Sequence, residues 1–309
     1  MNIAIIGRGD MLFRTMEAIH SGNHNIALII TAKEAPEYVF SSMDFKTFAK
    51  ENNIPFIHSP NISKKEILDK IGNNFILDLG ISINYTGIIN QDVIDLTKLG
   101  ILNMHAGDLP KYKGNAVVAW AILNGEKKIV NCIHKMVGGL LDSGDILYKE
   151  EYFLDKNTHI QSVFEWLESR SPIIFNKVID TLDKDPRYIL ERQSEDINDS
   201  LRCYPRKPED GKINWEKSAS YIHSIIRVSS EPFAGAFTFY NNKKVIFWDS
   251  EIIEDGENFI AVPGQILNIS DNGMTISTGD GKIQIKEVTF NNIRSAPSKF
   301  FSSIRDRFI

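Results

Sequence analysis

Cysteine and long apolar runs are what this 309-residue chain most clearly lacks. Its two cysteines, Cys132 and Cys203, lie far apart and belong to no Cys-x-x-Cys or Cys/His cluster, so neither a disulfide framework nor a zinc site is expected. No stretch approaches the ~20 apolar residues of a membrane span, and the N-terminus has neither the basic region nor the cleavage site of a secretory signal. We therefore expect a soluble protein of the cytoplasm with no membrane partner.

An excess of positive charge is missing as well. The chain carries 35 Lys and Arg against 40 Asp and Glu, a formal net charge of −5, so its overall charge does not support binding to nucleic acid. What it does have is length, and 42% of its residues are hydrophobic. That content suffices for a sizeable core, and the length favours two domains over one.

The first half of the chain alternates short apolar runs with helix-like patterns. Helical spacing of apolar residues follows the first run, in "DMLFRTMEAIHSG", and recurs in "DFKTFAKENN", "KKEILDKIGNN" and "AVVAWAILNGE". The runs expected to form strands are 2–7, 25–31, 75–81, 100–105 and 129–137, with a short one in "IPFIHS". This alternation predicts an α/β domain over 1–200, a mostly parallel Rossmann-like sheet with helices on both faces.

The second half changes character near residue 200. Short strand patterns follow one another in "AFTFYNNKKVIFWDSEI", "GQILNIS", "GMTISTG" and "KIQIKEVTF", and the first contains an Asn-Asn hairpin signal. We therefore predict a smaller β-rich domain over 201–309, built as an antiparallel sheet or barrel.

Two polar side chains, Asn103 and His105, end one of the predicted buried strands in "ILNMH". In sheets of this kind ligands bind outside the carboxyl ends of the strands, where Gly7, Arg8 and Gly9 also lie. Strand ends carry polar residues in many proteins, and a single histidine is more often structural than functional. The placement therefore favours a site without establishing one.

Two loop motifs have more than one interpretation. "GRGDML" lacks the third glycine of a dinucleotide fingerprint, which leaves a turn that offers backbone amides and Arg8 to a phosphate, or an Arg8 that is only solvated. "GGLLDSGD" contains Asp142 and Asp145 and is either an ordinary turn or part of a site. Two aspartates without a companion cluster are a poor metal site.

Taken in order, "NMH", "LPKYKG" and "DSGD" resemble the signature of the folate-dependent formyltransferases. The stretch from "YPRKPEDGKINW" onwards is similar to the C-terminal domain of methionyl-tRNA formyltransferases and of several sugar formyltransferases. One departure from the family pattern is that two leucines, rather than one residue, separate Gly139 from Asp142. Because of this difference, the resemblance does not determine the conformation of the loop.

The resemblance implies that Asn103, His105 and Asp142 catalyse transfer of a formyl group from 10-formyltetrahydrofolate to a primary amine. The three residue types suit that chemistry. An Asn amide can donate a hydrogen bond to the oxyanion, His can take the amine proton near neutral pH, and Asp can orient the imidazole. No metal is needed.

Further contacts are assigned by the same resemblance. The residues that match where the family holds the cofactor are Ser82, Ile83, Tyr85 and Leu140, although the first three, after "FILDLG", could simply be the exit from a strand into a loop. Candidates for a substrate diphosphate are Arg8, Gly9, Lys111 and Lys113, although the two lysines could simply keep their loop soluble. His134 could face either the site or the core.

The sequence says least about which molecule supplies the acceptor amine. Methionyl-tRNA formyltransferases carry a basic loop after the second strand, whereas residues 31–51 here contain three glutamates and an aspartate. Residues 201–309 hold fourteen Lys and Arg against thirteen Asp and Glu, nearly neutral where a tRNA-binding domain should be basic.

We therefore predict a nucleotide-linked amino sugar as partner, specifically dTDP-4-amino-4,6-dideoxyglucose, and no nucleic acid. Sugar formyltransferases of this kind serve bacterial surface glycans such as the lipopolysaccharide O-antigen, and we expect a homodimer. The alternatives are methionyl-tRNA, UDP-4-amino-4-deoxyarabinose, or a relative that binds formyl-folate without an amine acceptor.

Overall fold

The computed structural model describes all residues, 1–309, as two compact units. Unit 1 comprises Met1–Val117, Lys128–Tyr152 and Phe164–Tyr204, and unit 2 comprises Val118–Lys127, Phe153–Val163 and Pro205–Ile309. The two short segments of unit 2 that interrupt unit 1 have no signal in the sequence. The division into domains 1–200 and 201–309 stays a prediction.

Unit 1 contains a seven-stranded sheet with the order β3-β2-β1-β4-β5-β7-β8. Its strands are β1 (Asn2–Gly7), β2 (Asn25–Thr31), β3 (Phe56–His58), β4 (Leu79–Ile83), β5 (Ile101–His105), β7 (Lys128–Lys135) and β8 (Ile146–Phe153). The five strands from β3 to β5 are parallel, and β7 then pairs antiparallel with β5. The predicted mostly parallel α/β sheet is confirmed.

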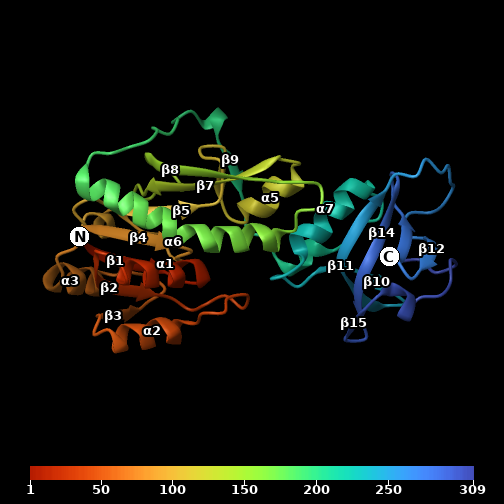
Figure 1. Ribbon diagram of the computed structural model, residues 1–309, viewed down its shortest axis with the longest axis horizontal. Helices are drawn as coiled ribbons and strands as arrows, with labels where there is room; N and C mark the ends of the chain where they lie inside the picture. Colours follow the sequence, from red (N-terminus) through yellow and green to blue (C-terminus); the bar gives the residue numbers. More distant parts are fainter. The chain divides into compact units, whose positions relative to one another are not determined.

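Helices cover both faces of this sheet (Figure 1). Those of the first part of the chain are α1 (Asp10–His20), α2 (Ser42–Glu51), α3 (Lys65–Asn74), α4 (Gln91–Ile94), α5 (Val117–Leu123) and α6 (Ile160–Lys184). The side chains of α1, α2 and α6 pack with Ile3 and Ile5 on one face, while those of α3 and α4 pack with Ala4 and Ile6 on the other. No helix is long and apolar enough to cross a membrane.

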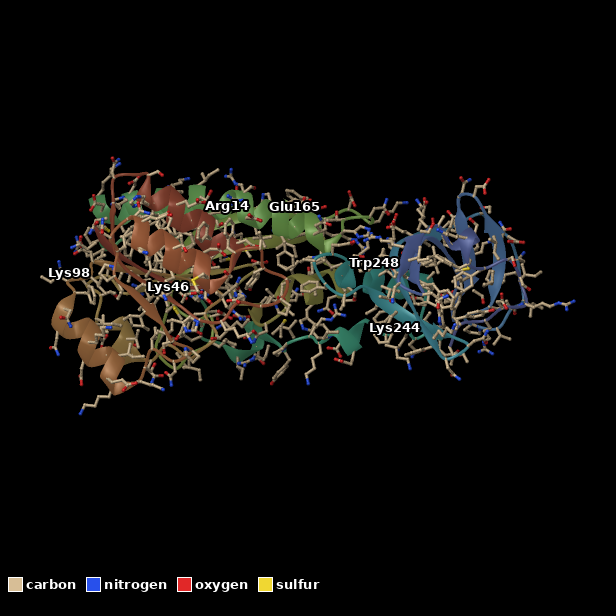
Figure 2. All side chains as sticks on the ribbon, turned by 90° about the horizontal axis from the view of Figure 1, so that it is seen from below. Arg14, Lys46, Lys98, Glu165, Lys244 and Trp248 are labelled. Atoms are coloured by element: carbon tan, nitrogen blue, oxygen red, sulfur yellow. The ribbon has the colours of Figure 1, made fainter.

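Charged residues link helices on the outside of unit 1. Figure 2 labels Arg14 on α1 and Glu165 on α6. Arg14 reaches Glu168 of α6, with 3.3 Å between Nε and Oε1. Because both side chains of this pair are exposed, the contact adds at most about 1 kcal/mol. The apolar faces of the helices, rather than such pairs, hold them against the sheet.

Two strand predictions in unit 1 need correction. The strand expected over 75–81 is observed at 79–83, because α3 continues to Asn74 and Phe75 caps it, while Leu77 forms only an isolated bridge with Thr97. The strand β8 was not expected, since its half-exposed sequence "ILYKEEYF" lacks a continuous apolar run.

The glycines of "GRG" are explained by close backbone packing. Gly7 has φ of 136°, and a Cβ there would lie 1.9 Å from the carbonyl oxygen of Ile83 on β4. Gly9, with φ of 83°, lies against the ring of Tyr38. Only glycine tolerates both the backbone angle and the contact, so this pair of glycines does not by itself call for a dinucleotide.

Unit 2 contains an antiparallel sheet with the order β10-β11-β14-β13-β12, and β15 pairs with β14. Its elements are α7 (Ala219–Ser229), β10 (Ala236–Tyr240), β11 (Lys243–Ile253), β12 (Ile266–Ser270), β13 (Gly273–Ser277), β14 (Lys282–Phe290) and β15 (Ile293–Ser295). The predicted hairpin turns at Asn241 and Asn242, whose φ values of 48° and 61° suit a type I′ turn. The predicted β-rich C-terminal part is confirmed.

A buried histidine ties α7 to two other parts of unit 2. His223 is hydrogen-bonded through Nδ1 to the Ser250 hydroxyl at 2.9 Å, and its Nε2 donates to the Lys156 carbonyl at 2.8 Å. Burial disfavours the charged imidazole and lowers the pKa of His223 to about 4.

This depressed pKa predicts acid destabilisation of unit 2. The folded state binds fewer protons than the unfolded state between pH 6.5 and 4, so the contribution of His223 is complete above pH 6.5 and is lost as the pH falls towards 4. The loss should amount to about 3 kcal/mol. Urea unfolding at several pH values should show it, and His223→Gln should flatten the slope while the exposed-site control His58→Gln leaves it unchanged. Equal slopes in wild type and His223→Gln would contradict the assignment.

Candidate active site

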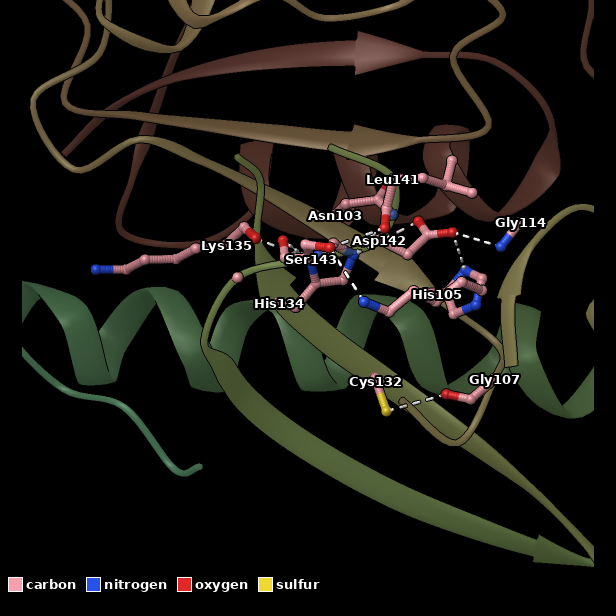
Figure 3. A network of polar contacts seen from close by, with 12 residues as sticks. Asn103, His105, Gly107, Gly114, Cys132, His134, Lys135, Leu141, Asp142 and Ser143 are labelled. Carbon is pink, nitrogen blue, oxygen red and sulfur yellow. Dashed lines mark hydrogen bonds and ion pairs between the residues drawn. The ribbon is translucent and has the colours of Figure 1, made fainter. Parts of the chain in front are cut away.

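Asn103 and His105 lie two residues apart on β5 and therefore point to the same side of the sheet. Across the antiparallel ladder, Asn103 lies directly opposite His134 and His105 lies opposite Cys132. The two strands thus bring an amide and two imidazoles to one face (Figure 3). His134, for which the sequence left two orientations open, faces this cluster rather than the opposite core.

Contacts of His134 fix both its tautomer and the amide of Asn103. Its Nδ1 donates to the carbonyls of Lys135 at 2.8 Å and Ser143 at 3.2 Å, so Nδ1 carries the proton of the neutral ring. Burial lowers the pKa of His134 to about 4, with the nearby Asp142 opposing that shift. Nε2 therefore accepts, and the Asn103 Nδ2 group donates to it at 3.2 Å. The amide nitrogen of Asn103 is thereby oriented into the cluster.

His105 lies between a backbone carbonyl and a carboxylate. Its Nε2 donates to the carbonyl of Tyr112 at 2.5 Å, and its Nδ1 lies 3.5 Å from Asp142 Oδ2. The imidazole is 7% exposed. Since Nε2 carries a proton for the carbonyl, Nδ1 is the atom that can accept another, and Asp142 is placed to stabilise the resulting charge.

The loop 137–145 delivers Asp142 to this cluster despite its additional leucine. Asp142 has φ of 43°, a left-handed conformation that Asp tolerates, and its Oδ2 accepts the backbone N–H of Gly114 at 2.7 Å. Its Oδ1 lies 3.8 Å from His134 Nε2. Lys113 also reaches the loop, where it donates to the Ser143 hydroxyl at 3.1 Å. Asn103, His105 and Asp142 therefore occupy one connected cluster.

The residues assigned to the cofactor are placed differently from one another. Ser82 and Ile83 are buried inside β4, where Ser82 pairs with Asn103, and not in the loop that follows the strand. The Tyr85 hydroxyl donates to the carbonyl of Ser59 at 2.9 Å. Burial raises the pKa of Tyr85 to about 12. Leu140 is 61% exposed on the loop that carries Asp142, and its neighbour Leu141 is also exposed.

The residues predicted to contact a diphosphate differ in their surroundings. Arg8 donates to the carbonyls of Asn84 and Lys33 at 3.1 and 2.8 Å, so these two donors of its guanidinium contact backbone. Lys111 lines a cavity of about 670 Å³ together with Arg192, Glu191 and Asp199. Gly9 caps the start of α1.

With this geometry in view, comparison with known proteins identifies the chain. Residues 1–179 match the family described as formyl transferase, and residues 206–305 match the formyl transferase C-terminal domain. The chain belongs to the formyl transferase family. A methionyl-tRNA formyltransferase of Ruminiclostridium cellulolyticum is 30% identical to this chain over 299 residues, which are 94% of the chain and 93% of that relative.

Solved structures of other family members share the fold of this formyltransferase. WlaRD, a sugar 3N-formyl transferase in the presence of dTDP and 5-N-formyl-THF, superposes with a TM-score of 0.65 at 22% identity, covering 92% of this chain and 97% of that chain. A methionyl-tRNA formyltransferase from Clostridium thermocellum reaches 0.52 at 24% identity, covering 75% and 96%. The predicted family and its formyltetrahydrofolate donor are confirmed.

Sequence reasoning missed two groups that shape the site of this formyltransferase. Gly114 supplies the N–H that binds Asp142, and its φ of 103° together with the Cys203 carbonyl beside it requires glycine. The sequence shows a glycine at the end of "KYKG", but nothing in the local sequence indicates that its N–H binds Asp142. Gln193 donates to the loop backbone at Asp142 and Gly144 and lies fifty residues beyond the motif.

Proposed function

We propose that this formyltransferase moves a formyl group from 10-formyltetrahydrofolate to the amine of a nucleotide-linked amino sugar, with Asn103, His105 and Asp142 as catalytic residues. The observation that carries the proposal is the connected cluster of an oriented amide and an imidazole whose Nδ1 faces a carboxylate. Formyl transfer to an amine requires these three functions.

Asn103 is the proposed electrostatic stabiliser. The bound donor supplies a formyl carbon, and negative charge develops on its oxygen as the amine adds. One hydrogen of the Asn103 Nδ2 group is used by His134, which leaves the other to donate to that oxygen. Because His134 fixes the amide in advance, little reorganisation is needed during the reaction.

His105 and Asp142 are proposed to move the proton. The amine loses a proton to His105 Nδ1 as its nitrogen bonds to the formyl carbon. The imidazolium then gives the proton to the departing folate nitrogen as the old carbon–nitrogen bond breaks. The carboxylate of Asp142, 3.5 Å from Nδ1, favours the charged imidazole between the two transfers.

For contacts with the folate donor and the nucleotide-linked sugar, we propose the residues that the sequence analysis assigned. Ser82, Ile83, Tyr85 and Leu140 would hold the folate, with the exposed Leu140 the most accessible of them. The residues proposed for the diphosphate are Arg8, Gly9, Lys111 and Lys113. The homodimer and the cytoplasmic location stay predictions.

The charge arrangement of unit 2 supports a small acceptor. Residues 201–309 carry fourteen Lys and Arg against thirteen Asp and Glu. Three of these cations are held in ion pairs, Lys282 with Asp255 at 2.8 Å, Lys286 with Glu251 at 2.8 Å, and Arg294 with Glu287 at 2.6 Å. A tRNA-binding domain would be expected to carry an excess of cations for the tRNA phosphates. The sugar 3N-formyl transferase WlaRD was solved in the presence of dTDP, and an N-formyltransferase from Helicobacter canadensis was solved with dTDP-3-aminofucose. We extend the dTDP carrier to this chain as dTDP-4-amino-4,6-dideoxyglucose.

Methionyl-tRNA is the second candidate acceptor. It is favoured by the relative at 30% identity, which matches this chain over 94% of its length and is named for that activity. UDP-4-amino-4-deoxyarabinose is the competing sugar. Its uridine carrier lacks the thymine methyl, a contact worth only about 1 kcal/mol.

An acceptor panel tests the proposal. The protein is incubated with 10-formyltetrahydrofolate and each of the three acceptors, and kcat/KM is measured from the mass gain of one formyl group. We expect the dTDP sugar to exceed methionyl-tRNA by more than about a hundredfold, with no salt-dependent tRNA binding at physiological ionic strength. Efficient formylation of methionyl-tRNA would overturn the sugar assignment, and preference for the UDP-pentose would overturn only the carrier.

A further inference from the structure

Residues 190–203, here termed the strap, follow α6 in unit 1 and lie between the two regions that match the family, which end at 179 and resume at 206. The strap contacts two loops beside the candidate catalytic residues. One is the loop 106–116 after His105, and the other is the loop 137–145 that contains Asp142.

The strap pairs with the first loop through β6 (Tyr112–Gly114) and β9 (Leu201–Cys203), which form a two-stranded parallel sheet. The Leu201 N–H donates to the Lys111 carbonyl at 2.5 Å, and the Asn115 N–H donates to the Cys203 carbonyl at 3.1 Å. This backbone supplies the carbonyl that accepts from His105 and the N–H that donates to Asp142.

The strap reaches the second loop mainly through one side chain. Gln193 Nε2 donates to the carbonyl of Asp142 at 3.1 Å and to that of Gly144 at 2.8 Å. Beside it, Ile146 exchanges backbone hydrogen bonds with Glu191. Since carbonyls only accept, an amide nitrogen at this position is required, and the orientation of the Gln193 side chain is unambiguous.

We propose that Gln193 is a positioning residue, which holds the backbone of Asp142 so that the carboxylate stays between Gly114 and His105. This inference rests on the proposed catalytic role of Asp142. Asp142 lies in a left-handed conformation, and Gly144 follows with φ of 105°, so the loop does not hold this shape through regular secondary structure. The Gln193 side chain, which comes from outside the loop, fixes the position of the Asp142 carboxylate relative to His105.

The test uses Gln193→Met, which keeps the length of the side chain and removes its donors, and Gln193→Glu, which presents only acceptors to the two carbonyls. The exposed neighbour change Glu195→Gln is the control. Turnover is measured with the acceptor that the panel above identifies. We expect kcat to fall roughly ten- to a hundredfold with the donor KM changed less than about threefold, because a small displacement of a catalytic group lowers the rate steeply.

Two further measurements separate positioning from general stability. In hydrogen–deuterium exchange, the amides of residues 138–144 should exchange about tenfold faster in Gln193→Met than in the wild type or in the control. In an Asp142→Asn background, Gln193→Met should change kcat less than about twofold, because its effect acts through Asp142.

Each outcome decides the proposal. Unchanged exchange in the loop, additive effects in the double variant, or loss of folding in both Gln193 variants by circular dichroism would overturn the positioning role. If Asp142→Asn alone leaves kcat intact while the loop loosens as expected, the proposed catalytic role of Asp142 fails instead.

Discussion

Replacing Asn103 by alanine is expected to lower kcat by 10²–10³-fold, the usual effect of removing one donor to a developing oxyanion. The reason is that Asn103 Nδ2, held by His134 at 3.2 Å, is the oriented side-chain amide of the cluster. Asn103→Asp should be as damaging, since it keeps the shape of the side chain and removes the donor. Steady-state kinetics of purified variants, with thermal melting to verify the fold, provide the measurement.

The matched control for this prediction is Asn73→Ala, at the exposed end of α3. Its kcat should equal that of the wild type. Turnover of either Asn103 variant within about threefold of the wild type would remove Asn103 from the proposed mechanism.

The second large effect is expected at His105 and Asp142. His105→Ala and Asp142→Asn should each lower kcat by roughly a hundredfold or more, the usual range for a positioned acid–base group. Nδ1 of His105 is the proposed proton acceptor, and Asp142 Oδ2 lies 3.5 Å from it. The same kinetic assay measures both, with substrate binding followed separately by KM.

Asp145→Asn is the control for Asp142, because Asp145 lies in the same "DSGD" turn and only its backbone carbonyl is used, by Lys135. It should leave kcat within about twofold of the wild type. Equal losses at Asp142 and Asp145 would show that the turn, rather than the Asp142 carboxylate, matters for turnover.

The buried strands and amphipathic helices could be predicted from the sequence because their patterns are local. "ILNMH" at 101–105 begins with two buried apolar residues and carries polar groups towards its end, and Asn241–Asn242 is a hairpin signal in itself. The strand β8 could not be predicted, because its many polar residues give no apolar run or clear alternation in the sequence. Whether such a segment forms a strand depends on its pairing with the rest of the sheet, which a local sequence pattern does not show.

The motif in the sequence predicts which residues form the candidate cluster, but not how their side chains are arranged. The order Asn, His, Asp suggested which side chains meet, but the register that sets His134 opposite Asn103 depends on strand pairing. Gln193 carries no signal at all, since its partners are the backbone carbonyls of Asp142 and Gly144. Backbone acceptors are the same in every residue, so sequence cannot show which of them a side chain will contact.

The pairing of Asn103 with His134 across two buried strands has a consequence for how the acceptor of such an enzyme can change during evolution. The geometry of the two side chains follows from the ladder between β5 and β7, whose residues Leu102, Met104 and Ile133 are buried in the core of unit 1. The proposed contacts to the acceptor, by contrast, lie on loops such as 106–116. Insertions and substitutions in those loops can therefore select a new amine while the reacting groups stay where the sheet places them.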